Sequence, residues 1–334
     1  MPSRASDFRH EPVLAAETLD ALRVRPDGAY VDCTLGGGGH ASLLLSRLGK
    51  GGRLVGLDRD EDALAAARPR LADVLASMSA GPSFDLVHVE FSRLAETLDA
   101  LGIASVDGIL ADLGVSSYQL DEPSRGFGYM QDGPLDMRMD RSSPLTAATI
   151  VNTWDRAGIE RILFAYGEER FSARIASAIC EQREKRPFVS TGALAETIRR
   201  AIPAAVRREG PHPAKRSFQA IRIAVNGELD ALDRLLADAP GRLAPNGRLA
   251  VISFHSLEDR RVKEAFRLLE NPCRCPKDLP CVCGKKPLGR AVTRQPVECG
   301  PEEKERNPRA RSAKLRVFER FGPEGEGRHV HDLR

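Results

Sequence analysis

The sequence has little excess charge of either sign and no long apolar run. Its 334 residues carry a formal net charge of only +3, so overall charge gives no argument for a nucleic-acid partner, and such an argument needs local basic clusters. No apolar run approaches the roughly 18 residues of a membrane helix. Residues 1–11 are polar and lack the apolar core of a signal peptide. These absences predict a cytoplasmic protein that does not bind membranes.

Cysteine is present but forms no regular framework. Its seven copies are an odd number, with three scattered along the chain and four between residues 273 and 283. This distribution suits a reducing compartment better than a set of disulfides. The clustered residues invite a zinc interpretation, but their C-x-C pairs are tighter than the usual C-x₂₋₄-C spacing. Ordinary reduced thiols in a surface loop are favoured, and no metal ligand is assigned to the cluster, which comprises Cys273, Cys275, Cys281 and Cys283.

Short apolar strands alternate with helical patterns in the first third of the chain. Strands are expected at 29–32, 53–58, 84–89 and 106–112, and helices at 13–22, 40–48 and 61–75. This alternation implies βαβ units and a parallel sheet. The predicted fold class is therefore α/β, with a doubly wound, Rossmann-like sheet.

The alternation stops after the fourth strand. Helical periodicity without a convincing strand follows at 159–164, 172–182 and 192–202. The α/β pattern then resumes with a helix at 217–237, a Pro-Asn-Gly turn within 243–248, a strand at 249–253, a helix at 257–269 and an edge strand at 313–318. The predicted domains are a first part of the core at 1–120, an inserted helical domain at 121–214, a second part of the core at 215–320 and a flexible tail at 321–334.

A glycine-rich loop connects the first expected strand to the helix that follows. Four glycines at 36–39 precede His40, and glycine lets the backbone turn tightly and approach a ligand closely. Asp58 ends the next strand, where a carboxylate can accept hydrogen bonds from both hydroxyls of an adenosine ribose. Strand, loop, helix and acid together predict a cofactor site rather than a glycine turn without a ligand.

The glycine loop fits two cofactor classes. It satisfies G-x-G-x-x-A, which is typical of nicotinamide dehydrogenases, so an oxidoreductase is an alternative. Asp32 ends the first strand just before the loop. Doubly wound methyltransferases usually place an acid there, near the methionine part of the cofactor, whereas nicotinamide enzymes usually have glycine or an apolar residue. Asp32 therefore favours S-adenosylmethionine.

Asp112 and His255 each follow an expected strand. Ligands of an open α/β sheet bind outside the carboxyl ends of its strands, so the carboxylate of Asp112 is expected to face the cofactor or a target amine. A turn-capping role explains Asp112 equally well. His255 is a candidate catalyst at the same edge, although a hydrogen-bonded structural histidine is the more common case.

At these motifs the sequence closely resembles the RsmH (MraW) family of small-subunit ribosomal RNA cytosine-N4 methyltransferases. The resemblance runs over nearly the whole chain and leaves only the C-terminal tail unmatched. Several matching strings are long and unusual, which makes the match specific. They are residues 10–14, 32–40, 112–117 with 119–121, 125–127 with 133–140, 217–226, 253–259 and 307–316.

The resemblance implies a class I methyltransferase core with an inserted helical domain that recognises the substrate. It implies S-adenosyl-L-methionine as the cofactor and the N4 amine of a cytidine in 16S ribosomal RNA, in the decoding-centre region, as the target. An assembled small subunit is favoured over free RNA, and a homodimer is left open. The implied cofactor contacts are Gly38, Gly39, His40, Asp58, Phe91, Asp112 and Gln119.

The target amine needs help because its lone pair is delocalised into the cytosine ring. A hydrogen-bond acceptor would assist it, and Asp112 is the candidate. Amino-methyltransferases acting on DNA usually carry an Asn/Asp-Pro-Pro-aromatic loop where this chain, like its family, has Asp-Leu-Gly-Val at 112–115. The partner of the amine therefore stays unassigned. The base must also leave its stack, and candidate platforms, each equally explained as core, are Phe127, Tyr129 and Phe254.

Local basic clusters supply the electrostatic case for RNA. As a set they favour phosphate contact, although interleaved glutamates at 302, 303 and 305 also fit a solvated surface. A non-catalytic RNA-binding protein on the same scaffold is a third hypothesis, and the intact glycine loop with Asp58 argues against it. The clusters are Arg207-Arg208, Lys215-Arg216, Lys285-Lys286 with Arg290 and Arg294, and residues 306–316.

Overall fold

The chain forms two compact units. A computed structural model describes residues 12–79, 81–207, 212–276 and 282–322. The first unit combines two segments, Met1–Gly114 and Asp230–Arg334, and the second is the continuous segment Val115–Leu229. The predicted tail at 321–334 lies almost wholly outside the described residues.

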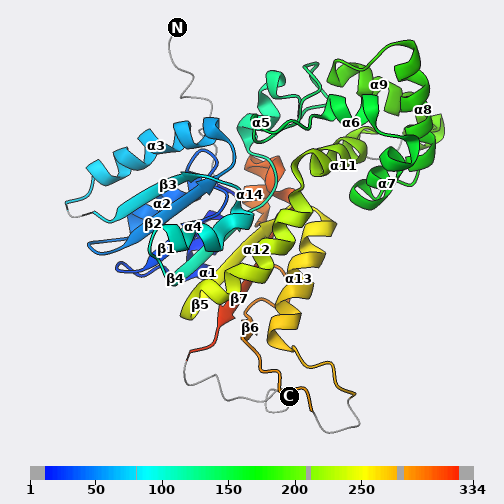
Figure 1. The fold of residues 1–334 in the computed structure, drawn as a ribbon. Helices are drawn as coiled ribbons and strands as arrows, with labels where there is room; N and C mark the ends of the chain where they lie inside the picture. The colour runs from blue at the N-terminus through cyan, green and yellow to red at the C-terminus, as the bar shows by residue number, and fades with distance from the viewer. Residues whose placement is uncertain (1–11, 80, 208–211, 277–281, 323–334) are drawn as a thin grey trace. The chain divides into compact units, whose positions relative to one another are not determined.

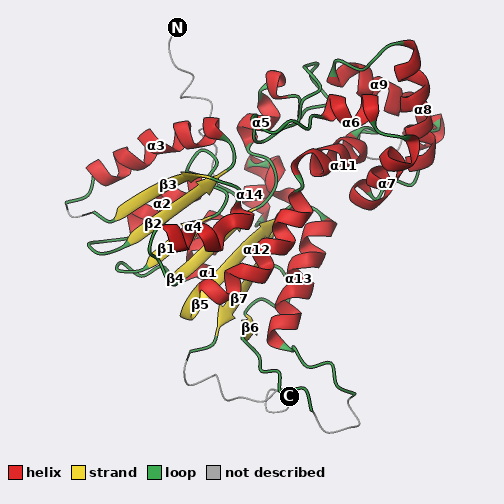
Figure 2. Cartoon of the chain, viewed as in Figure 1, coloured by secondary structure: helices red, strands yellow, loops and turns green. Residues whose placement is uncertain are grey.

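The first unit is built on a mixed seven-stranded sheet in the order β3-β2-β1-β4-β5-β7-β6, drawn in yellow in Figure 2. Neighbouring strands from β3 to β5 pair in parallel, whereas β7 is antiparallel to both of its neighbours. This arrangement confirms the predicted α/β class. The strands are β1 (Ala29–Asp32), β2 (Arg53–Asp58), β3 (Ser83–His88), β4 (Val106–Asp112), β5 (Leu243–Ser253), β6 (Gly289–Ala291) and β7 (Lys314–Arg320).

Helices cover both faces of this sheet because alternate strand residues point to opposite sides. Leu54 and Leu110 belong to a core with α1, α2 and α3, whereas Val55 and Ile109 belong to a second core with α4, α12 and α13. Figure 1 shows these helices around the sheet. Their bounds are α1 (Ala15–Leu22), α2 (Gly39–Arg47), α3 (Glu61–Ala76), α4 (Leu94–Ala100), α12 (Glu228–Arg242) and α13 (Ser256–Glu270), with α14 (Pro301–Arg306) near the C-terminal end.

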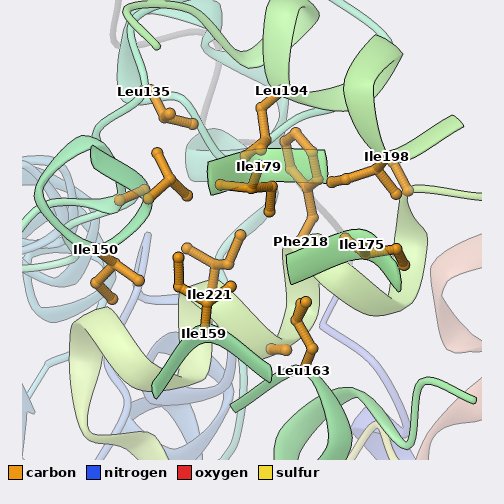
Figure 3. Packing of buried hydrophobic residues seen from close by; sticks show 14 of the residues in the cluster. Leu135, Ile150, Ile159, Leu163, Ile175, Ile179, Leu194, Ile198, Phe218 and Ile221 are labelled. Carbon is orange, nitrogen blue, oxygen red and sulfur yellow. The ribbon is translucent and has the colours of Figure 1, made fainter. Parts of the chain in front are cut away.

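The second unit is helical and has its own apolar core. Isoleucines and leucines from several helices meet Phe218 there, as Figure 3 shows. Amphipathic spacing explains this, since residues three or four apart lie on one helix face. The helices are α5 (Ser117–Asp121), α6 (Ala147–Thr153), α7 (Arg156–Gly167), α8 (Ser172–Lys185), α9 (Thr191–Ala201), α10 (Ala204–Arg207) and α11 (Lys215–Asn226).

The bounds of the inserted unit differ from those expected. The inserted domain was expected at 121–214, whereas the second unit comprises Val115–Leu229. It extends beyond residue 214 because the apolar face of α11 packs into the helical core. The single helix expected at 217–237 was also wrong. It is two helices, α11 and α12, separated at Gly227, whose φ of 59° ends α11 in the left-handed region that glycine adopts readily.

Two expectations near the second half of the sheet were also wrong. The turn expected within 243–248 lies inside β5, where Asn246 has a φ of 63° and the pairing with β4 shifts register. The last strand was expected at an edge, but β7 lies between β5 and the short edge strand β6. A three-residue strand leaves too little periodicity to be found from sequence. No helix in the described ranges is long and apolar enough to cross a membrane.

Candidate functional site

Three acidic residues end three neighbouring parallel strands. Asp58 ends β2, Asp32 ends β1 and Asp112 ends β4. Asp32 pairs in register with Gly56 on one side and Leu110 on the other. The acids therefore gather at the carboxyl edge of the sheet, where ligands of this fold class bind.

The glycine loop bends at this edge and leaves little space for a side chain at Gly38. Gly36 and Gly38 have φ values of 51° and 76°, which residues with a Cβ rarely adopt. A Cβ on Gly38 would also lie 3.1 Å from the Cβ of Ala67 on α3. Both observations explain why the loop needs glycine, and α2 begins directly after it.

Asp58 is held by backbone amides. Its Oδ2 accepts a hydrogen bond from the Gly36 N–H (2.8 Å) and its Oδ1 from the Asp60 N–H (2.8 Å). Each carboxylate oxygen retains acceptor capacity. Burial raises the pKa of Asp58 to about 6, because desolvation outweighs these two hydrogen bonds. The carboxylate is thus oriented to accept hydroxyl groups.

Asp32 is almost fully buried and only partly satisfied. Its Oδ1 accepts a hydrogen bond from the Thr34 N–H (3.1 Å), but its Oδ2 has no hydrogen-bond partner among the described residues. Desolvation, together with the nearby charge of Asp58, raises the pKa of Asp32 to about 7. A buried acceptor without a partner calls for an explanation.

His40 and Asp112 face each other across the loop. The Nε2 of His40 lies 3.6 Å from the Oδ2 of Asp112, and neither ring nitrogen makes a hydrogen bond within the part of the chain that the structure describes. Burial lowers the pKa of His40 to about 4, although a backbone group of Val13 opposes this. His40 is therefore neutral at pH 7.

Asp112 is fixed through its backbone rather than its carboxylate. Its N–H donates to the Thr34 Oγ1 (2.7 Å), and its Oδ1 is buried without a hydrogen-bond partner in the described chain. Desolvation raises the pKa of Asp112 well above its ordinary value, and the charges of Asp32 and Glu258 add to the effect. A turn-capping role was the alternative for this residue, and no described backbone N–H satisfies its Oδ1.

His255 caps a helix. It is the N-cap of α13, where its Nδ1 accepts from the Glu258 N–H (3.4 Å), while Oε2 of Glu258 accepts from the His255 N–H (3.3 Å). This reciprocal pattern is a capping box, which explains His255 structurally. Its catalytic role stays a prediction.

Two further residues at this edge were not predicted from the sequence. Thr34 accepts from the Asp112 backbone, and Glu258, 2% exposed, adds negative charge near Asp112. The spacing of His255 and Glu258 is that of a capping box, a signal that could have found Glu258. Nothing in the local sequence could have found the Thr34 contact, because its partner lies far along the chain.

The other expected cofactor contacts lie in different surroundings. Phe91 opens a short 3₁₀ helix after β3 and packs partly against the core that includes α4. Gln119 belongs to the second unit, where its Oε1 accepts from the Ser116 N–H (3.1 Å) in a capping box of α5. The cofactor roles of both residues stay predictions.

The three aromatic residues expected as platforms for the base lie in different surroundings. Phe127 is buried in the core of the second unit. Tyr129 stacks on His212 with ring centroids 4.7 Å apart and meets Phe218 edge-on. These contacts identify Phe127 and Tyr129 as packing residues. Phe254 belongs to the first unit and lies beside Gly114, which follows the end of β4 by two residues.

The basic clusters contain several structural residues. Arg316 is only 7% exposed and pairs with Asp259 (2.6 Å), while Arg290 pairs with Glu319 (2.6 Å). Arg316 links α13 to β7 and is not open basic surface, whereas Arg290 links β6 to β7 but keeps a side chain that is 56% exposed. Arg208 lies outside the described residues. The RNA interpretation of the remaining set stays a prediction.

The chemistry of the edge favours one kind of ligand. Desolvation raises the pKa of both Asp32 and Asp112, and the charge of Asp32 raises the pKa of Asp112 further. An anionic pyrophosphate placed beside the glycine loop would meet these two buried acids. A ligand with a positive charge would relieve this repulsion. A ribose would complete the acceptor capacity of Asp58. The site therefore fits a cationic nucleoside better than a dinucleotide.

Comparison with known proteins points to one family. The family model described as MraW methylase matches residues 7–321. The chain is 56% identical to a ribosomal RNA small subunit methyltransferase H of Symbiobacterium thermophilum, over 93% of this chain and 96% of that protein. It is 52% identical to the protein of that name in Brevibacillus brevis, over 94% and 98%.

Among solved structures, the chain resembles a putative rRNA-methylase from Clostridium thermocellum. The identity is 11%, the TM-score is 0.44, and the match covers 94% of this chain and 98% of the other. This likeness is too weak to bear on function.

Proposed function

The chain belongs to the MraW methylase family, and we propose that it transfers a methyl group from S-adenosyl-L-methionine to the N4 amine of a cytidine in 16S ribosomal RNA. The observation that carries the cofactor part is the group of buried acceptor atoms without partners at the carboxyl edge, Asp32 Oδ2 and Asp112 Oδ1. The RNA part rests on the relatives, which are named for ribosomal RNA of the small subunit.

The residues present fit this cofactor. Asp58 would accept the ribose hydroxyls, since both of its oxygens retain lone pairs. Asp32 and Asp112 would face the positively charged methionine part, and a positive charge there lowers their raised pKa values. Gly38 and Gly39 would allow close approach of the backbone. When bound, the sulfonium supplies an already activated methyl group, so no covalent enzyme intermediate is needed.

The work left to the protein is positioning. Orienting a nucleophile against a reactive carbon is worth on the order of 7–11 kcal/mol. Asp112 is the proposed acceptor for a proton of the target amine, because its carboxyl reaches the site edge while its backbone is fixed by Thr34. Phe254, beside Gly114, is the proposed surface against which the unstacked base rests. The second unit is the proposed substrate-recognition module.

The decisive experiment is methyl transfer from labelled S-adenosylmethionine to small ribosomal subunits that lack their own modifications, followed by nucleoside analysis. Label in N4-methylcytidine is the expected result, and free 16S RNA assayed in parallel tests the preference for the assembled particle. Label in another nucleoside would refute the N4 assignment. Cofactor binding without any transfer would support a non-catalytic RNA-binding protein instead.

Titration with nicotinamide dinucleotides tests the alternative that the chain is an oxidoreductase. Binding of S-adenosylmethionine with no measurable binding of the dinucleotides is expected, because Asp32 and Asp112 oppose a pyrophosphate. Tight dinucleotide binding would overturn the cofactor assignment and return the chain to the oxidoreductase class.

A further inference from the structure

A proline-rich loop at residues 271–288 connects α13 to β6 and gathers cysteines. The loop leaves the end of α13 and returns to it, since the Leu288 N–H donates to the Leu269 carbonyl (3.0 Å). Figure 1 shows α13 leading away to this loop. The helix has 15 residues, so its two ends are about 20 Å apart. The loop therefore lies far from the N-cap of α13 and from the acidic edge.

Three sulfur atoms meet in this loop. The Sγ atoms of Cys273, Cys275 and Cys283 all lie within 4.8 Å of one another. Sulfur ligands of a tetrahedral zinc ion, each about 2.3 Å from the metal, are about 3.8 Å apart. The three side chains are thus already close to the spacing of a shared metal ion, although Cys283 lies eight positions along the chain from Cys275 and ten from Cys273.

The tight spacing of the first pair does not prevent shared ligation. Alternate side chains of an extended segment point to the same side, so Cys273 and Cys275 can face one ion together. Directly after Cys283, Gly284 has a φ of 62°, which turns the chain sharply where a side chain would be strained. The C-x-C spacing counted against zinc in the sequence, whereas the folded loop brings its cysteines together.

Residues 282–286 of the loop have little apolar packing to stabilise them. Val282 is 89% exposed, and the residues from 282 to 286 are all exposed. Apolar burial is what normally offsets the entropy of ordering a chain. A structural metal can supply that stabilisation instead.

We propose that Cys273, Cys275 and Cys283 bind a structural zinc ion that orders this loop. Thiolate-rich tetrahedral sites select zinc or iron–sulfur clusters, and closely spaced sulfurs around a single point favour one zinc ion. The described residues supply three ligands, and a fourth completes the shell. Cys281 lies outside the described residues and has no part in the argument.

The test measures metal on the full chain, purified without a polyhistidine tag or chelator. About one zinc per chain is expected by elemental analysis. Replacing zinc with cobalt should give the intense near-ultraviolet absorption of thiolate-to-cobalt charge transfer. Cys273→Ser, Cys275→Ser and Cys283→Ser should each lower the zinc content severalfold. The matched control is Cys180→Ser, a partly buried cysteine of the second unit, which should keep its zinc.

A second readout does not depend on how the variants fold. In the wild-type chain, a strong chelator should speed alkylation of the three cysteines and cleavage by trypsin after Lys285. Cofactor affinity should change less than about twofold, since the loop is remote from the acidic edge. Zinc well below one per chain together with chelator-independent alkylation would overturn the proposal, and so would iron in place of zinc or a disulfide between these cysteines.

Discussion

A buried polar cluster in the second unit and the acidic edge of the first unit differ in how fully their hydrogen bonds are satisfied. In the second unit, Asn226 accepts from the Met139 N–H (2.8 Å) and donates to the Met137 carbonyl (2.8 Å), while Arg125 donates to the Met139 carbonyl (3.0 Å). At the acidic edge of the first unit, Asp32, His40 and Asp112 keep buried atoms without hydrogen-bond partners in the described chain. A satisfied cluster stabilises a fold, whereas an unsatisfied one is available to a ligand.

This difference revises the meaning of the motif at 133–140. Frequent glycine, aspartate and methionine together with weak periodicity are typical of a functional loop. In the structure, Met137 and Met139 are buried, and Asp136 forms a 2.7 Å ion pair with Arg138. Several residues of this family-matching string therefore stabilise an irregular segment of the second unit.

The largest expected effect is on the satisfied cluster. Asn226→Ala leaves a buried N–H and a buried carbonyl without their side-chain partner, so we expect a loss of about 3–5 kcal/mol in the stability of the second unit. Thermal unfolding and hydrogen exchange of residues 115–229 measure it. Gln219→Ala, on the same helix and with one 3.2 Å bond to the Tyr166 carbonyl, is the control and should cost less than about 1 kcal/mol. Similar losses for both variants would contradict the comparison.

The second effect concerns ligand binding at the acidic edge. Asp58→Asn replaces one acceptor oxygen by a donor, so affinity for S-adenosylmethionine should fall about 100-fold, which corresponds to about 2.7 kcal/mol. Calorimetric titration measures it. Asp85→Asn, on the neighbouring strand β3, removes an ion pair with Arg53 and should leave affinity within about twofold. An Asp58→Asn variant that binds as tightly as the wild type would remove Asp58 from the site.

The third prediction is a gain in folding stability rather than a loss. The folded pKa of Asp32 is about 7, above the roughly 3.9 of an unfolded chain. Between these values the unfolded state releases a proton that the folded state keeps, so stability falls as pH rises through this window. Asp32→Asn removes this loss and should stabilise the cofactor-free chain by about 2 kcal/mol at pH 8, with little change near pH 4.

Urea unfolding at the two pH values measures the effect of Asp32→Asn. The exposed Asp73 offers a control, since Asp73→Asn should change stability by less than about 0.5 kcal/mol at either pH. If Asp32→Asn destabilised the chain at pH 8, Asp32 would be a structural residue like Asn226 rather than one retained for a ligand.

The smallest effect is the pH dependence of cofactor affinity. Asp32 and Asp58, with pKa values of about 7 and 6, are increasingly protonated below pH 7, while His40 stays neutral down to about pH 4. A cationic ligand prefers ionised acids, so affinity should rise about tenfold from pH 5.5 to pH 8 and then level off. Asp112, whose pKa burial also raises, would add to the same trend. Affinity that decreased with pH would indicate a histidine-controlled site instead.

The sequence predicted features that are set by neighbouring residues and missed contacts between residues far apart in the chain. Strands β2 and β4 were predicted residue for residue, because buried parallel strands bounded by turns stand out clearly. The placement of Asp32, Asp58 and Asp112 at one edge followed from topology alone. The break at Gly227 was missed because a single glycine within a helical pattern is ambiguous. The contact between Thr34 and Asp112 and the cysteine cluster depend on tertiary packing, which no local pattern reports.

The inserted arrangement of the second unit also bears on how the chain acquires its structure during synthesis. The ribosome delivers residues 115–229 as one continuous stretch, so this unit has all its partners before β5 and β7 are made. The sheet has to wait, because β4 pairs with β5 and β5 with β7. Since domains generally fold as units while the chain emerges, the helical unit can fold first, and the sheet can be completed only after β5 and β7 have been synthesised.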